Sequence, residues 1–298
     1  MAHPDLAKLE AIAREGRVQI IRMLTHAGSG HPGGSLSAID ILTTIYFNRL
    51  RYDAKRPDWE DRDRFILSKG HCVPAQYYCM AKAGYFPMER TITLRKMGSP
   101  LQGHPDRVML PGIEAATGSL GQGIGISMGL ALGLKLAGKE ARVYCVMGDG
   151  ETQEGQVWES FMSAPKLGAP DRHLDNLCVI LDYNGIQLDG FVKKIMDLEP
   201  IVDKLKAFGW PVLDINGHDI AQVDKALDQA ETIKGAPTFI VAHTVKGKGV
   251  SFMENDPEWH GKAPKPAEAV EAIRQIVGEP VPAWVEPIIN ELQALEKK

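Results

Sequence analysis

The sequence has few cysteines, no excess of basic residues and no uninterrupted apolar run at its N-terminus. Its four cysteines form no Cys-x-x-Cys pair and no spacing typical of a metal site, which argues against a disulfide scaffold or a zinc centre. We expect them to be reduced core thiols in a cytoplasmic protein. With a formal net charge of -4 and scattered Lys and Arg residues, the chain has no basic field that would attract nucleic acid.

Secretory and membrane-spanning segments are missing as well. Residues 1–24 have the periodicity of an amphipathic helix and carry acidic residues, so they lack the apolar core of a signal peptide. Residues 119–138 are apolar and nearly long enough to span a bilayer, but they are rich in glycine and interrupted by Gln122 and Lys135. We interpret this stretch as a core or interface helix and expect no membrane partner.

From about residue 140 onward, the sequence alternates between apolar runs and helical patterns. Runs such as RVYCVMG and NLCVILDY are continuous, and helical stretches lie between the runs at 151–166, 197–208 and 219–233. Continuous apolar strands that alternate with helices are typical of a sheet buried on both faces. The pattern therefore predicts an α/β fold, with a parallel β-sheet covered by helices on both faces.

The two ends of the chain differ from this pattern. Residues 1–50 indicate two helices around a glycine-rich turn, and the tail has prolines followed by a short amphipathic pattern. The sequence contains no internal repeat and no low-complexity segment. We expect an α/β domain over residues 1–263 and a helical appendage or linker over residues 264–298.

Polar residues directly follow the predicted strands. One run leads into a Gly-Asp-Gly turn at Asp149 and the next into an Asn-Gly turn at Asn184, while Asn216 and His243 end two further runs. Because ligands bind at the carboxyl ends of parallel strands, Asp149 and Asn184 are candidates for one site. Their oxygens suit Mg²⁺ or Ca²⁺, which usually share their ligands with phosphate. Gly150 would let a phosphate approach the start of the next helix, although an ordinary helix-capping turn has the same sequence.

Five of the nine histidines neighbour a glycine. Glycine neighbours place a side chain on exposed and sharply turned backbone, as in many catalytic loops. A single histidine of this kind is more often a surface residue, but histidine also moves protons to and from hydroxyl groups near neutral pH. The five are His31, His71, His104, His218 and His260.

The contexts of these histidines resemble transketolase. The motifs agree in order and approximate spacing over residues 10–262, and they are SGHPG, DRDRFILSKGH, GHP, TGSLGQG, MGDGETQEG, YNGIQLDG and WHG. The Gly-Asp-Gly turn followed further along the chain by an asparagine is similar to the thiamine diphosphate-binding motif. The resemblance implies a thiamine diphosphate-binding fold with the cofactor held through Mg²⁺, for which Ca²⁺ or Mn²⁺ can substitute.

Carried over residue by residue, the resemblance implies three groups of site residues. The metal ligands would be the side chains of Asp149 and Asn184 and the carbonyl of Ile186. The cofactor contacts would be His71, Gly118, Leu120, Gly150, Asn184 and His260. The catalytic residues, which hydrogen-bond sugar hydroxyls and move their protons, would be His31, His104 and His260. Glu154 would lie at a subunit interface, although an acid stabilised by the dipole at a helix N-terminus would fit this position equally well. His218 is interpreted as a turn residue.

The implied activity is transfer of a two-carbon ketol unit from a ketose to an aldose, with sugar phosphates as substrates. Transketolases continue through a pyrimidine-binding and a C-terminal domain, so we expect a separate C-terminal subunit, most simply in a two-plus-two heterotetramer. One alternative is another thiamine diphosphate enzyme, such as one resembling 1-deoxyxylulose-phosphate synthase, which would not need so many sugar-facing histidines. A second alternative is a binding subunit without catalysis, which could have lost the metal ligands and site histidines present here.

Overall fold

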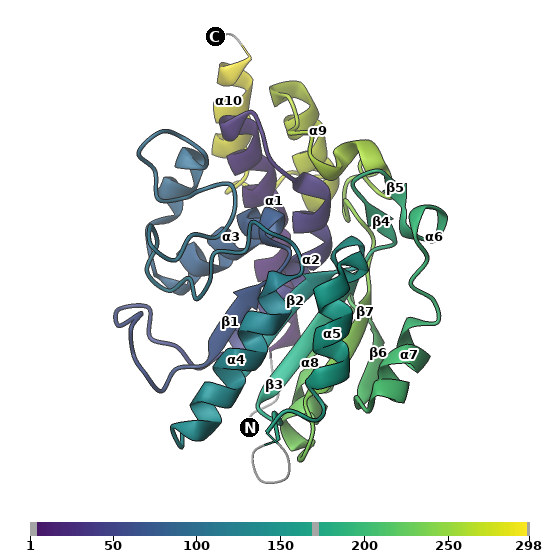
Figure 1. Cartoon of the computed structure of the whole chain (residues 1–298). Helices are drawn as coiled ribbons and strands as arrows, with labels where there is room; N and C mark the ends of the chain where they lie inside the picture. The colour runs from purple at the N-terminus through teal and green to yellow at the C-terminus, as the bar shows by residue number, and fades with distance from the viewer. Residues whose placement is uncertain (1–4, 169–172, 297–298) are drawn as a thin grey trace.

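The computed structural model describes residues 5–168 and 173–296, and a five-stranded sheet lies at its centre (Figure 1). The order across the sheet is β1-β2-β3-β7-β6, and every neighbouring pair is parallel. The predicted parallel α/β fold is confirmed. The strands are β1 (Arg64–Leu67), β2 (Val143–Gly148), β3 (Leu177–Tyr183), β6 (Val212–Asn216) and β7 (Thr238–His243).

The strands read as continuous apolar runs because both faces of the sheet are buried. In β2, Tyr144 and Val146 belong to one hydrophobic cluster, whereas Val143, Cys145 and Met147 belong to another. Successive side chains of a strand point to opposite faces, so the two clusters lie on opposite sides of the sheet. All four cysteines are buried free thiols, as predicted.

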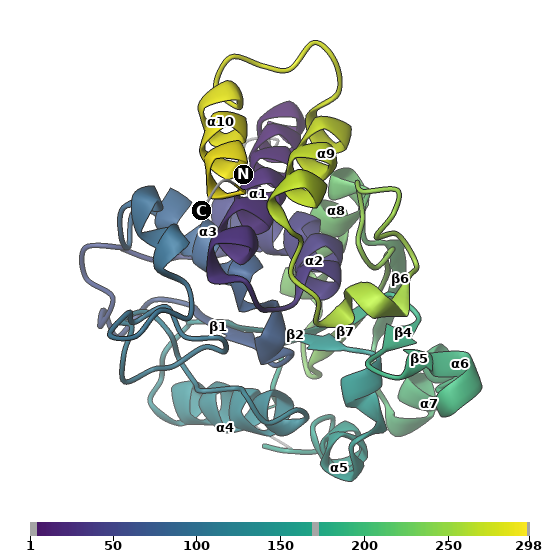
Figure 2. The same ribbon diagram turned by 90° about the horizontal axis from the view of Figure 1, so that it is seen from above.

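Helices cover both faces of the sheet (Figure 2). One layer contains α1 (Leu6–Ala27), α2 (Pro32–Thr44), α3 (Val73–Ala83), α8 (Ile220–Thr232), α9 (Pro266–Val277) and α10 (Glu286–Leu295). The other contains α4 (Gln122–Leu136), α5 (Gly155–Ser163) and α7 (Ile201–Phe208). Beyond one edge of the sheet lie a hairpin, β4 (Ile186–Gln187) with β5 (Gly190–Phe191), and the short α6 (Val192–Ile195). Short 3₁₀ or π-helical segments occur at Ile45–Arg49, Gly70–Cys72, Met88–Thr93, Gly150–Gln153 and Pro257–His260.

The first two helices confirm the prediction for residues 1–50. Asp5 caps α1 by accepting a hydrogen bond from the Lys8 N–H at 3.0 Å, and Gly28 ends this helix in the left-handed region with φ 67°. The next helix, α2, begins at Pro32, whose fixed φ suits a first helical position. Every residue of α2 is buried, and His31 is the N-cap residue directly before this buried helix.

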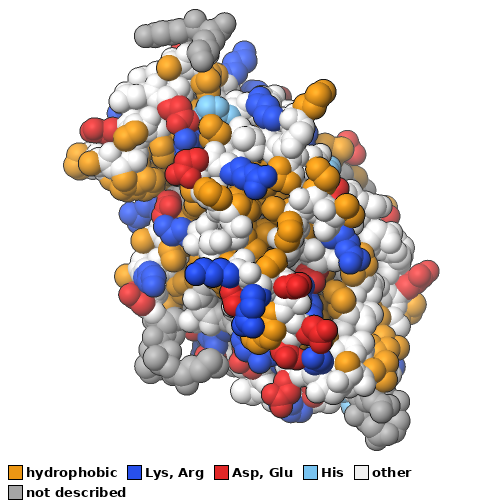
Figure 3. All heavy atoms as spheres, turned by 90° about the vertical axis from the view of Figure 1, so that its left-hand side faces the viewer, with side chains coloured by type: hydrophobic (Ala, Val, Ile, Leu, Met, Phe, Trp, Pro, Cys, Tyr) orange, Lys and Arg blue, Asp and Glu red, His pale blue; other side chains and the backbone are white. Residues whose placement is uncertain are grey.

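The apolar stretch 119–138 contains α4, which packs one side on the sheet and leaves the other side exposed. Three glycines on its outer side, Gly125, Gly129 and Gly133, have no atom within 4 Å of the position that a Cβ would take. Within residues 5–168 and 173–296, no helix is long and apolar enough to cross a membrane. Hydrophobic side chains are exposed on this side of the molecule (Figure 3), and on α4 and the 88–112 segment they are Met97, Val108, Met109, Ile126 and Leu136.

The tail beyond residue 263 forms α9 and α10, which pack beside α1. Ile273 and Leu292 belong to the same buried cluster as the core side of α1. Glu291 on α10 also forms an ion pair with Arg22 on α1 at 2.7 Å. The tail is therefore helical and shares the core of the first helical layer, and a domain boundary after residue 263 stays a prediction.

Candidate active site

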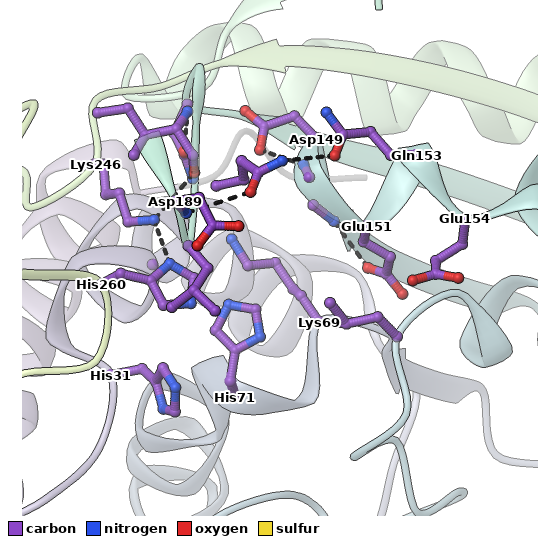
Figure 4. Close-up of a pocket in the computed structure, with 18 of the residues that line it drawn as sticks. His31, Lys69, His71, Asp149, Glu151, Gln153, Glu154, Asp189, Lys246 and His260 are labelled. Atoms are coloured by element: carbon purple, nitrogen blue, oxygen red, sulfur yellow. Dashed lines mark hydrogen bonds between the residues drawn. The ribbon is translucent and has the colours of Figure 1, made fainter. Parts of the chain in front are cut away.

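The carboxyl ends of the strands open into a cavity of about 390 Å³ (Figure 4). Its position is the one expected for a ligand site in a parallel sheet. The cavity brings together all the residues that the sequence predicts for the metal, the cofactor and the proton transfers. They are His31, His71, His104, Gly118, Leu120, Asp149, Gly150, Asn184, Ile186 and His260.

Asp149 lies in the turn after β2, at the oxygen-rich end of the cavity. Its carboxylate is buried and accepts hydrogen bonds from the N–H groups of Gly150 at 2.7 Å and Gly185 at 2.5 Å. Burial raises the pKa of this carboxyl to about 6, and the opposing charge of Lys69 only partly offsets the effect. A glycine is required after Asp149 because a Cβ at Gly150 would lie 2.6 Å from the Cβ of Gln187.

Asn184 and Ile186 follow β3 at the same end of the cavity. The Asn184 Oδ1 accepts a hydrogen bond from the Ile186 N–H at 3.1 Å, and the Ile186 carbonyl accepts one from the Lys246 ammonium at 3.0 Å. One carboxylate, one amide oxygen and one carbonyl form the kind of set that binds a hard divalent cation. A cation would also compensate the buried charge of Asp149. Among the residues that the structure describes, no three His, Cys, Asp or Glu side chains cluster as metal ligands.

Four histidines form the opposite end of the cavity. His31 precedes α2, His71 lies in the turn after β1, and His260 lies in the turn 257–260. The ring centroids are 5.1 Å apart for His31 and His71, 5.3 Å for His31 and His260, and 5.1 Å for His71 and His260. His104 lies on the 88–112 segment with its ring centroid 6.3 Å from that of His31. The predicted histidines thus converge from four separate segments.

These rings are neutral near pH 7. Burial lowers the pKa of His31 to about 4, with help from Arg95, and lowers the pKa of His260 to about 3, with help from Lys246. Burial likewise lowers the pKa of His71 and of His104. A neutral imidazole has one nitrogen that donates and one that accepts, which suits proton exchange with hydroxyl groups. Within the described residues, the His31 Nδ1 is buried without a hydrogen-bond partner.

Lys69 also lines the cavity, and sequence reasoning missed it. Its ammonium lies 2.5 Å from the carboxylate of Asp182, and both side chains are buried. Burial alone would lower the pKa of Lys69, but the Asp182 carboxylate, with further contributions from Cys72 and Asp149, makes the net shift upward. Asp182 also accepts hydrogen bonds from the hydroxyls of Ser37, at 2.6 Å, and Thr244. The pair therefore joins α2 to the ends of β1, β3 and β7.

Lys246 is the second buried lysine in the cavity that the sequence did not single out. Its ammonium contacts the Nδ1 of His260 at 2.6 Å and the Ile186 carbonyl, so it bridges the two ends of the cavity (Figure 4). Burial and the nearby charge of Lys69 lower its pKa to about 8. Both lysines stand beside a glycine after a predicted strand, in SKGH and VKGKG. That context is the sequence signal that could have found them.

Glu151 joins the segments around the oxygen-rich end. Its buried carboxylate accepts hydrogen bonds from the Ser68 hydroxyl and from the N–H groups of Gly121 at 2.8 Å and Gly148 at 3.0 Å. Sequence reasoning did not single out this residue. Glu154, predicted to face a subunit interface, is exposed at the cavity rim, and its role at an interface stays a prediction.

The cavity does not include every polar residue at the strand ends. Asn216 and His243 are exposed outside it, and His243 instead bonds Asp214 at 2.7 Å. The interpretation of His218 as a turn residue is incomplete. Its ring is largely buried and bonds both Asp40 and the backbone of Val245.

Comparisons with known proteins agree with this geometry. The family model described as transketolase, thiamine diphosphate binding domain, matches residues 9–287. The chain is 42% identical to a 6-deoxy-6-sulfo-D-fructose transketolase subunit of Clostridium sp. (strain MSTE9), with 82% of this chain and 89% of the relative covered. It is 37% identical to an apulose-4-phosphate transketolase subunit of Phocaeicola vulgatus, with 90% and 93% covered. The fold is similar to that of transketolase from Leishmania mexicana, with a TM-score of 0.85 and 30% identity over 97% of this chain but only 45% of that one.

Proposed function

The chain belongs to the transketolase family, in which it corresponds to the thiamine diphosphate-binding domain, and from that premise we propose that it is the N-terminal subunit of a two-subunit transketolase. Two relatives named as transketolase subunits match it over most of their length, whereas it spans less than half of the Leishmania transketolase. A separate C-terminal subunit would carry the pyrimidine-binding and C-terminal domains, most simply in a two-plus-two assembly in the cytoplasm.

The oxygen-rich end of the cavity would hold the diphosphate through Mg²⁺. The ligands from this chain would be the side chains of Asp149 and Asn184 and the Ile186 carbonyl, and Gly150 would donate its N–H to the diphosphate. The buried Asp149 carboxylate, whose pKa is raised to about 6, supports a cation at this position. When bound, thiamine diphosphate supplies the nucleophile and the electron sink for cleavage of a C–C bond in the ketose.

The histidine end would bind the sugar and move its protons. The Nδ1 of His260 faces the Lys246 ammonium, so the ring carries its proton on Nε2 and can donate toward a sugar oxygen. The Nδ1 of His31 is buried and has no hydrogen-bond partner within the described residues. We assign His31, His104 and His260 to the hydroxyl groups of the sugar, and His71 to the cofactor.

We propose that the donor is a ketose with an anionic group. The names of the two subunit relatives describe sugars that carry a sulfonate or a phosphate. In this chain, Lys246 lines the cavity, and the positive charge of Arg95 acts on both His31 and His104. Positive charge on this side of the cavity favours an anionic substrate.

The observation that carries the proposal is the joining, in one cavity, of the oxygen ligand set with four neutral histidines. The test is to measure ketol transfer from a ketose phosphate at saturating thiamine diphosphate and Mg²⁺, with this chain alone and with its C-terminal subunit. We expect turnover only with both subunits. Full turnover by this chain alone would contradict the two-subunit arrangement, and brisk consumption of pyruvate by the complex would favour an enzyme that resembles 1-deoxyxylulose-phosphate synthase.

A further inference from the structure

We propose that His218 is a positioning residue for Lys246. It belongs to a buried polar chain in which Arg17 and Asp40 orient its ring and the ring holds the backbone directly before Lys246. This inference rests on the proposed function only in that Lys246 is taken to serve the active site. His218 lies outside the active-site cavity, in a separate hollow that Arg17, Asp40 and Lys248 also line. The segment that carries Lys246 and Lys248 thus contributes one lysine to each space.

The polar chain begins at a buried ion pair between α1 and α2. Asp40 on α2 is 4% exposed, and the guanidinium of Arg17 on α1 donates to both of its carboxylate oxygens, at 3.0 and 2.5 Å. The same carboxylate lies 2.7 Å from the Nδ1 of His218. A bidentate arginine holds a carboxylate in a defined orientation, so Asp40 presents a fixed acceptor to the histidine.

The hydrogen bonds of His218 determine its tautomer. Its Nε2 accepts a hydrogen bond from the Val245 N–H at 2.8 Å, and a nitrogen that accepts carries no proton. The proton of the neutral ring is therefore on Nδ1, from which it is donated to Asp40. Both nitrogens of the ring have a partner, which is the arrangement that orients an imidazole and not the one expected of a solvent-facing turn residue.

The second partner of His218, Val245, directly precedes Lys246. Hydrogen bonds also hold the backbone that follows this lysine. The Gly247 N–H donates to the Gly33 carbonyl at 3.0 Å, and the Nε of Arg17 donates to the Lys248 carbonyl at 3.2 Å. A Cβ on Gly33 would lie 2.9 Å from the Cγ of Lys246, so this lysine packs directly against the start of α2. The Lys246 segment is thereby attached to the helix that follows His31.

The position of Lys246 matters because its ammonium is the contact shared by the two ends of the cavity. It lies 2.6 Å from the Nδ1 of His260 and 3.0 Å from the Ile186 carbonyl. If Val245 moves, both contacts lengthen together, and the tautomer of His260 is no longer fixed. A displacement of this kind, away from the reacting atoms, is enough to slow a reaction that depends on alignment.

Two substitutions distinguish the two hydrogen bonds of the His218 side chain. In His218→Gln, the side-chain oxygen reaches the place of Nε2 and can still accept from the Val245 N–H. In His218→Asn, the amide can reach Asp40 in the place of Nδ1 but falls short of Val245. His243→Gln serves as a matched control, because His243 is exposed outside both the cavity and the polar chain.

The first readout is amide hydrogen exchange of residues 244–250 in the chain with thiamine diphosphate and Mg²⁺. We expect faster exchange at the Val245 amide in His218→Asn, and protection close to wild type in His218→Gln and in the control. Equal exchange in the two His218 variants would overturn the proposal. This readout does not depend on turnover, so it can fail or succeed separately from the proposed function.

The second readout is ketol transfer by the complex with the C-terminal subunit. We expect the turnover number of His218→Asn to fall by about tenfold to a hundredfold, with most of the rate restored in His218→Gln. In a Lys246→Ala background, His218→Asn should cause little further loss, because the two residues act through one contact. Equal losses in both His218 variants, or full additivity with Lys246→Ala, would show that His218 serves general stability and would overturn the proposal.

Discussion

At one end of the active-site cavity a buried carboxylate, Asp149, is held by two backbone N–H groups and forms no ion pair within the described part of the chain. At the other end four imidazole rings converge, and burial together with nearby cations keeps them uncharged near pH 7. The first end is prepared to receive positive charge. The second is prepared to exchange protons with hydroxyl groups. Under the proposed function, one end of the cavity would hold the charged cofactor and the other would bind the sugar.

The two buried lysines explain how such different environments coexist at close range. Lys69 is paired with Asp182, although its charge still lowers the pKa of His71 and of Lys246. Lys246 has no such partner among the described ion pairs, and it stands between the ends, against His260 and the Ile186 carbonyl. The division therefore depends on Lys69 staying with Asp182 and on Lys246 staying between the two ends.

The largest expected effect comes from breaking the Lys69–Asp182 pair. Asp182→Asn would leave a buried ammonium without its counter-charge, and we expect the free energy of unfolding to fall by about 3–5 kcal/mol. Urea titration of the isolated chain measures this loss, and Asp189→Asn at the exposed rim is the control. A loss below about 1 kcal/mol, the range of exposed pairs, would mean that Lys69 can turn to Asp149, and the proposed division of charge would be wrong.

The next effect concerns the histidine end alone. His31→Ala and His104→Ala should each lower the ketol-transfer rate of the complex by about 100-fold, since each removes a proton-transfer group. The melting temperature and the Kd of thiamine diphosphate should hardly change. Steady-state kinetics and calorimetry provide the measurements, with His243→Ala as the control. A variant that keeps full activity does not belong to the histidine end.

The converse experiment addresses the oxygen-rich end. Asp149→Ala should raise the Kd of thiamine diphosphate by about tenfold or more at a fixed Mg²⁺ concentration, which corresponds to about 1.4 kcal/mol. Removal of the metal by a chelator should weaken binding in the wild type by a comparable factor and add little in the variant. Equal thiamine diphosphate binding by the variant and the wild type would contradict the assignment of Asp149 as a metal ligand.

The effect that is smallest at neutral pH, and that appears only as the pH falls, is a change in acid stability. The His31 ring has a pKa of 6.5 in the unfolded chain and about 4 in the folded one, so the unfolded state binds more protons between these values. This contribution to stability is present above pH 6.5 and is lost as the pH falls toward 4. His31→Gln removes it, so the unfolding free energy of the variant should fall less steeply over this range. Parallel curves from urea titrations at several pH values would contradict a neutral buried ring.

Much of the fold and of the site could be predicted because the determining features are local. Strands buried on both faces are continuous apolar runs. A residue directly after such a run, such as Asp149 or Asn184, must lie at the carboxyl end of its strand. Glycine-flanked histidines mark turns that can reach a ligand. The transketolase resemblance then supplied the roles of these residues.

The residues that prediction missed depend on contacts distant in sequence. Lys69 is buried only because Asp182 lies across β2 from it, and a lysine in a sequence is usually interpreted as a surface residue. His218 bonds a residue 178 positions away along the chain, so no local pattern reveals its function. The glycines of α4 hide the difference between its buried and exposed sides, because glycine carries no polarity of its own.

The order of strands in the sheet has a consequence for synthesis on the ribosome. β6 is made before β7, yet among the described strands it lies at the edge of the sheet and pairs with β7 alone, and β7 is inserted between β6 and β3. Until residues 238–243 have emerged from the ribosome, β6 has no neighbour and the exposed edge of β3 is open to wrong partners. Lys246 and His260 are translated later still. The nascent chain can therefore assemble the sheet and several helices while the cavity stays incomplete, so we expect cofactor capture only after His260 has emerged.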